Sequence, residues 1–185
     1  IYLKGISKRY KSGYALSFEK TGDELFIDFK QNVLGENYIM EFWFKPEDME
    51  IKKEMMIFTN NNGSSSKSTL ILNPDSTLNL NFNYRKAIEH SDNIKSKAKV
   101  KLGQWNFVEI VLKKNKGKLI LNDDVTKFNI KDNLSFVNDR IIFADKEPEK
   151  RNFETHNELT HKFMIDELCF WNNADKAGYI SKNKF

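Results

Sequence analysis

The 185-residue chain contains little of several residue types that define particular classes of protein. Its one cysteine, Cys169, cannot form a disulfide within the chain, so a disulfide-rich scaffold is excluded. Cys169 lies in an apolar stretch, where we expect a small buried hydrophobe rather than a reactive thiol. With 8 glycines and 3 prolines, the composition also excludes a collagen-like chain. Apolar runs are short, as in Met55-Met56-Ile57-Phe58, so we expect no membrane-spanning segment.

Arginine is scarce as well. The chain has 4 Arg against 26 Lys, together with 21 Asn, and a formal net charge of +4. Arg is the side chain of choice for bidentate contacts to phosphates and bases, so we do not expect nucleic acid as a partner. The Lys and Asn bias is more typical of an AT-rich genome than of a particular ligand.

Aromatic residues, in contrast, are abundant. The 15 Phe, 6 Tyr and 3 Trp supply too much apolar surface for a disordered segment. The length suits one domain over residues 1–185. Because the chain starts at Ile1 and shows no signal-peptide core, we expect a mature segment or a domain of a larger protein.

The hydrophobic pattern has a period of two, which predicts strands. In residues 78–84 (LNLNFNY) apolar residues alternate with Asn, as in a strand with one face on a core and one face in water. Residues 38–45 (YIMEFWFK) place Tyr38, Met40, Phe42 and Phe44 on one side and Glu41 and Lys45 on the other. Further strands are predicted at 14–19, 24–29, 54–60, 68–73, 105–112, 117–122, 125–130, 140–144 and 162–172. A hairpin turn is expected at 113–117, with Gly117 supplying any positive φ.

About a dozen short strands, polar loops at 60–66, 73–76 and 145–161, and almost no helical periodicity favour a β-sandwich. Five segments, in order, resemble the motifs of laminin-G-like domains. Residues 13–18 (GYALSF) with 24–27 (ELFI) are similar to the opening G-x-A-L-x-F … V-x-I, and residues 38–46 to F-T-x-x-F-W-V-K-P. Residues 102–108 and 118–123 are similar to L-x-x-G-x-W-H-H-V and L-Y-V-D-G, and residues 163–172 to the closing F-x-G-x-I-D-E-V-R-I-W-N.

The resemblance implies the concanavalin A-like jelly roll, a sandwich of two antiparallel sheets with a curved concave face. Asn122-Asp123-Asp124 lacks the usual Gly, and Met164 stands where Gly is common. The resemblance also places Trp43, Trp105 and Trp171 in motifs of the core, where we expect them to be buried. Lectins, adhesive modules, toxin segments, binding modules and some glucanases share this fold, so the fold does not choose between these functions.

Catalytic patterns are missing from the sequence. Glucanases of this fold carry two Glu on one strand face with an Asp between them, and no Glu-x-Asp-x-x-Glu or Glu-x-Asp-x-Glu stands on a predicted strand. Asp166 and Glu167 are adjacent, so on a regular strand they point to opposite faces. His156 and His161 are five residues apart, which does not fit the i and i+4 spacing of a zincin. An enzyme would need a carboxylate pair from different strands, for which we consider Glu41 and Glu167.

Calcium is the most common metal in the domains that this sequence resembles, where oxygen ligands from loops bind it. The candidate ligands are Asp23, Glu24, Asp123, Asp124 and Asp166. The resemblance makes Asp166, in the closing Ile-Asp-Glu motif, the best single candidate for a structural ion. The alternative is that Asp166 only accepts hydrogen bonds from neighbouring backbone.

Two polar patterns are candidates for ligand binding. On a strand, Lys95, Lys97, Lys99 and Lys101 would form a ladder on one face, suited either to an anionic polymer or to protecting an edge strand from aggregation. The face formed by Asn79, Asn81 and Asn83, closed by Tyr84 and Arg85, offers neutral donors and acceptors for sugar hydroxyls.

We therefore expect a non-catalytic module of a larger secreted or cell-surface protein that binds a glycan, with calcium as an optional structural ion. The alternative is a structural or protein-interaction domain, in adhesion or in a toxin, that packs on other domains of its parent and predicts a large exposed apolar patch.

Overall fold

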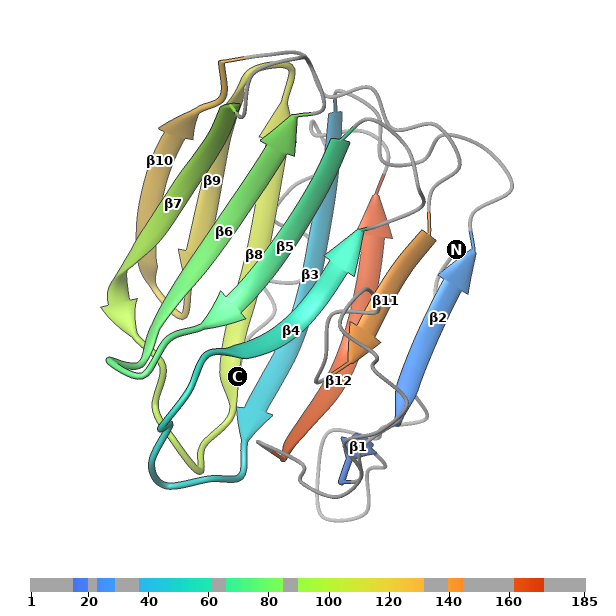
Figure 1. Cartoon of the computed structure of the whole chain (residues 1–185), viewed down its shortest axis with the longest axis vertical. Helices are drawn as coiled ribbons and strands as arrows, with labels where there is room; N and C mark the ends of the chain where they lie inside the picture. Colours follow the sequence, from blue (N-terminus) through green and yellow to red (C-terminus); the bar gives the residue numbers. More distant parts are fainter. Residues whose placement is uncertain are drawn as a thin grey trace.

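The computed structural model describes residues 15–19, 23–28, 37–60, 66–84, 90–131, 140–144 and 162–171. In this part of the chain all regular elements are β-strands, arranged in two six-stranded sheets that face each other (Figure 1). No helix among the described residues has the length and hydrophobicity of a membrane span.

Sheet A is antiparallel and has the strand order β1-β12-β3-β8-β9-β10. Its strands are β1 (Leu16–Phe18), β12 (Phe163–Trp171), β3 (Asn37–Pro46), β8 (Asn106–Lys113), β9 (Lys116–Leu121) and β10 (Asp124–Asn129). Sheet B is antiparallel and has the order β2-β11-β4-β5-β6-β7. Its strands are β2 (Glu24–Asp28), β11 (Arg140–Ala144), β4 (Met55–Asn60), β5 (Ser66–Leu72), β6 (Thr77–Tyr84) and β7 (His90–Lys99).

The core lies between the sheets and follows the predicted alternation. Every second residue of the long strands points inward, as with Met40, Phe42 and Phe44 in β3. Phe42 meets two rings of sheet B edge-on, Phe58 at 6.5 Å and Phe143 at 5.7 Å between ring centroids. Since each fully buried Phe contributes roughly 1.5–3 kcal/mol, these rings hold the two sheets together.

All the predicted strands are present, with ends that shift by a few residues. The strand that carries the lysine ladder differs most from the expectation. It is β7, which starts at His90 and ends at Lys99, so Lys101 lies beyond the strand. The backbone N–H of Lys101 is bonded instead to the side chain of Asn106.

The expectation for Gly117 is wrong. The positive φ of the β8–β9 turn belongs to Lys114, at 56°, and Gly117 lies within β9. A Cβ at Gly117 would stand 2.2 Å from Cζ of Phe128 and 2.8 Å from the carbonyl oxygen of Val111. Gly117 is therefore needed for the close approach of the Phe128 ring, which packs across the sandwich on Phe82.

The expectation of buried tryptophans is also wrong. Trp105 is 39% exposed, and Trp43 and Trp171 are half-buried. None of the three belongs to the core between the sheets. Trp43 is the Cα partner of Asp166 and packs on Phe107 on the outward face of sheet A. The tryptophan of this motif therefore belongs to a second apolar layer on the outward face, not to the core between the sheets. Cys169 of the same layer is buried, as predicted.

Candidate functional site

The asparagines of β6 point away from the core, on the outward face of sheet B. Leu78, Leu80 and Phe82 point inward, which leaves Asn79, Asn81 and Asn83 on the other face. Strand pairing continues this face sideways, because Asn81 is the Cα partner of Thr69 in β5 and of Asn93 in β7. Thr69 in turn pairs with Thr59 of β4. We refer to Thr59, Thr69, Asn79, Asn81, Asn83 and Asn93 as the asparagine face.

The asparagine face contains unused hydrogen-bonding capacity. Thr59 Oγ1, Asn79 Oδ1 and Asn81 Oδ1 are buried, and none of them has a hydrogen-bond partner in the described part of the chain. Thr59 as a whole has no exposed surface. Because a buried polar atom without a partner costs about 1–3 kcal/mol, donors supplied from outside the described residues would stabilise this group of atoms.

The same row of residues becomes apolar toward the opposite edge of sheet B. Thr59 pairs with Ile142 of β11, and Ile142 pairs with Phe26 of β2. Phe26 is 47% exposed, so an aromatic ring is accessible at that end. With strands about 4.8 Å apart, Phe26 and Asn81 are separated by about 19 Å across the sheet.

The other predicted members of this site are only partly described. Asn83 is exposed at the end of β6, and Tyr84 completes the strand. Nothing is described of the Tyr84 side chain, and Arg85 lies outside the described residues. The sequence did not identify Thr59 and Thr69, because their place beside Asn81 depends on the register of three strands.

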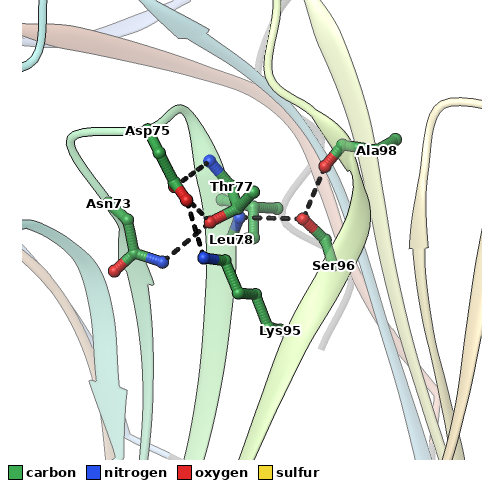
Figure 2. Close-up of polar contacts among 7 residues, drawn as sticks. All are labelled: Asn73, Asp75, Thr77, Leu78, Lys95, Ser96 and Ala98. Atoms are coloured by element: carbon green, nitrogen blue, oxygen red, sulfur yellow. Dashed lines mark hydrogen bonds and ion pairs between the residues drawn. The ribbon is translucent and has the colours of Figure 1, made fainter.

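The lysine ladder is interrupted by an ion pair at its first member. Lys95 Nζ lies 2.6 Å from Asp75 Oδ2, and Figure 2 shows both side chains beside the β5–β6 turn. The hydrogen bond from Lys95, and further ones from the side chain and backbone N–H of Thr77, hold the pKa of Asp75 well below its usual range. Lys95 is therefore engaged in organising the turn.

A second group of bonds in Figure 2 stabilises an irregular stretch of the β6–β7 ladder. The register shifts between Thr77 and Asn79. There, Ser96 Oγ accepts a hydrogen bond from Leu78 N and donates one to the Ala98 carbonyl oxygen. The register shift thereby determines which residues of β6 lie opposite the lysines of β7.

Lys97 and Lys99 are exposed on the edge strand of sheet B. Lys97 N donates a hydrogen bond to Thr126 Oγ1 of β10, the edge strand of sheet A. Lys95 is paired with Asp75 and Lys101 lies beyond the strand, so the ladder is reduced to Lys97 and Lys99. Their exposed position on an edge strand fits the protection of that edge from aggregation.

The candidate calcium ligands lie apart from one another. Asp123 and Asp124 are exposed where β9 turns into β10. Asp23, beside Glu24 at the start of β2, accepts a hydrogen bond from Glu19 N at 2.9 Å. Among the described residues, no three His, Cys, Asp or Glu side chains form a cluster that could hold a metal ion.

Asp166 lies at an irregularity of β12. The register shifts between Asp166 and Cys169, and Glu167 has a positive φ of 51°, so strict alternation of side chains does not hold there. Asp166 Oδ1 accepts a hydrogen bond from Glu167 N at 2.8 Å. This bond is the backbone role that the sequence left open as the alternative to a metal ligand.

One pair of carboxylates was not identified from the sequence. Glu41 of β3 and Glu109 of β8 are direct Cα partners on the outward face of sheet A, and they are 2% and 4% exposed. Burial raises the pKa of Glu41 to about 7, and the nearby Glu109 carboxylate contributes to the rise. Glu41 Oε2 has no hydrogen-bond partner in the described part of the chain. The partner of Glu41 is thus Glu109 rather than Glu167, and both acids are shielded from water.

No protein-family model matches the sequence, and comparison with curated proteins gives no match either. Solved structures do share the fold. The binding domain of botulinum neurotoxin serotype D superposes over 85% of this chain with a TM-score of 0.64 and 16% identity. Domains LG4-5 of the mouse laminin α1 chain match over 83%, with a TM-score of 0.62 and 12% identity. The carbohydrate-binding module CBM66 from Bacillus subtilis matches over 84%, with a TM-score of 0.53 and 9% identity.

The present chain spans 39% of the neurotoxin chain, 40% of the laminin chain and 85% of the CBM66 chain. At these identities the similarity establishes the fold alone. The jelly-roll sandwich of two antiparallel sheets that the motif series implied is confirmed.

Proposed function

We propose that the protein is a non-catalytic glycan-binding module whose site is the asparagine face of sheet B. The observation that carries the proposal is the group of three buried oxygens, on Thr59, Asn79 and Asn81, that have no hydrogen-bond partner among the described residues. Sugar hydroxyls donate and accept hydrogen bonds, and a glycan bound over Asn79 and Asn81, which keep part of their surface exposed, would meet their amide groups.

The charge of this face favours a neutral sugar. Its members are Thr and Asn. Two lysines are direct Cα partners of members, Lys95 of Asn79 and Lys67 of Asn83, and Lys95 is already paired with Asp75. Phe26, about 19 Å from Asn81, would stack on the apolar face of a pyranose ring.

Two further points support a binding role over catalysis. The fold is shared with a bacterial carbohydrate-binding module and with the binding domain of a toxin. Glu41 and Glu109 are 2% and 4% exposed and belong to sheet A, not to the sheet that carries the asparagine face. The same neighbours support a place in a larger secreted or cell-surface protein. A structural calcium ion at Asp166 stays part of the proposal, and millimolar calcium should then raise the midpoint of thermal unfolding.

The test is a glycan array followed by titration calorimetry, with Asn79→Ala and Asn81→Ala as variants. Each variant removes an acceptor that has no partner in the part of the chain that the structure describes, so we expect unchanged stability but at least tenfold weaker binding. Asn115→Ala, in the exposed β8–β9 turn, is the matched control and should bind like the wild type. Absence of binding to any glycan, with and without calcium, would overturn the proposal.

The second candidate function is recognition of a protein. Met49 is 76% exposed, and its sulfur packs against Gly103, where a Cβ atom would lie 2.8 Å from it. Trp105, two residues after Gly103, is 39% exposed. Large exposed apolar side chains of this kind are typical of interface anchors. A partner captured by the wild type and lost with Trp105→Ala, while glycan binding stays negative, would favour this function.

A further inference from the structure

A groove of about 420 Å³ lies over β8, β9 and β10, toward the edge of sheet A that is opposite β1 in the strand order. It is distinct from the asparagine face, which belongs to sheet B. Its floor includes Val111 and Ile120, and four lysine side chains surround it: Lys113, Lys116, Lys118 and Lys127. Its volume is at the lower end of the range for small-molecule sites.

The register of the strands places like charges directly opposite each other in this groove. Lys118 is the Cα partner of Lys127, and Lys113 is the partner of Lys116. Like charges opposed across a ladder are destabilising. In the described part of the chain, the side chains of Lys116, Lys118 and Lys127 form no ion pair. An anion bound between them would relieve this repulsion.

The remaining surface of the groove defines what the anion is attached to. Val111 stands in the same row as Lys118 and Lys127, and Ile120 lies one row away, about 6–7 Å along the strand. The acid Glu109 is opposite Ile120 and marks the end from which an anionic group would be repelled. A ligand is thereby oriented with its charge toward the lysines and its apolar body over Ile120.

Sugars fit this groove poorly. Apart from Glu109 and Asn129, the side chains around it offer no acceptor for a hydroxyl, because lysines only donate and the floor is aliphatic. Lys ammonium groups act as point charges and bind carboxylate, sulfate or phosphate without a fixed geometry.

We propose that this groove is a second binding site, for a small amphipathic organic anion: one acidic group on a compact apolar body. The site depends on no residue of the asparagine face. It differs from the lysine ladder on β7, whose exposed Lys97 and Lys99 do not line this groove and provide the natural control.

The probes are 2-naphthalenesulfonate, the neutral 2-naphthalenemethanol and inorganic sulfate, tested by calorimetry and by backbone amide shifts in NMR. We expect saturable binding of the sulfonate that shifts amides of β8, β9 and β10. The neutral alcohol and sulfate alone should each bind at least tenfold more weakly, because each lacks half of the recognition.

The variants separate the groove from charge in general. Lys118→Gln combined with Lys127→Gln should weaken the sulfonate about tenfold, from the loss of two exposed charge contacts, and should not lower the unfolding midpoint. Lys97→Gln combined with Lys99→Gln should leave binding unchanged. Equal losses in both double variants, shifts centred on β6 and β7, sulfate binding as tight as the sulfonate, or no saturable binding would each overturn the proposal.

Discussion

Replacing Glu41 by Gln is expected to remove a large part of the pH dependence of stability near neutrality. In the folded protein, burial and the neighbouring Glu109 carboxylate raise the pKa of Glu41 from 4.5 to about 7. The folded state therefore holds a proton that the unfolded state releases between these two values. Because the folded state binds more protons there, stability is full below pH 4.5, falls as the pH rises to about 7, and is constant above.

The size of the effect follows from the shift. A difference of about 2.5 pH units corresponds to roughly 3 kcal/mol, at about 1.36 kcal/mol per unit. For a domain of this length, 1 kcal/mol moves the unfolding midpoint by about 2–4 °C, so the wild type should lose about 6–12 °C between pH 4.5 and 7.5. The Glu41→Gln variant carries no charge at any pH, so its curve should lack this fall.

The assay is urea denaturation of the wild type and Glu41→Gln in steps from pH 4.5 to 8.5. The difference between the two curves isolates Glu41 from histidines and other groups that titrate in the same range. Glu109→Gln should shift the fall to lower pH without abolishing it, because burial of Glu41 persists. Exposed Glu50→Gln is the control and should reproduce the wild type. A constant difference between wild type and Glu41→Gln at all pH values would refute the reasoning.

Three further predictions concern packing, the turn and the thiol. Gly117→Ala should destabilise the fold by about 1–3 kcal/mol in urea denaturation, since the new methyl group displaces the Phe128 ring; an unchanged midpoint would contradict this packing. Asp75 has a lowered pKa, so it should stay ionised and keep its bonds below its ordinary value of 3.8, losing them only in stronger acid. Hydrogen exchange of the Thr77 amide should accordingly accelerate in Asp75→Asn, whereas the wild type should keep its protection at pH 3, and equal protection in the variant would argue against this bond. Burial raises the pKa of Cys169 to about 11, with nearby Glu41 and Glu167 acting in the same direction, so a disulfide reagent at pH 8 should label it only after unfolding; rapid labelling of the folded protein would show that the thiol is accessible.

The strands could be predicted from the sequence because one face of each is buried. The alternation in 78–84 identified β6 and the outward position of Asn79, Asn81 and Asn83. Thr59 and Thr69 were not identified, although they complete the same face. Their place depends on the pairing of β4, β5 and β6, and the spacing of residues within one strand carries no information about pairing.

The pairing of Glu41 with Glu109 illustrates the same limit. Each Glu interrupts an apolar strand, which is a signal that could have been used, but 68 residues separate them along the chain. The predicted burial of Trp105 was wrong for another reason. The motif fixed its place beside β8 but not its exposure, which depends on the irregular segment that precedes the strand.

The strand order of sheet A has a consequence for biosynthesis. Consecutive strands β8, β9 and β10 pair with their sequence neighbours, so they can form as soon as they are synthesised. β1, in contrast, pairs with β12, and Leu16 is opposite Ile165, 149 residues later. Such distant pairing carries a large loop-closure cost and slows folding. On the ribosome, β1 must wait until β12 has emerged, so we expect the sandwich to close after translation of β12, with the consecutive strands β4 to β7 and β8 to β10 already paired.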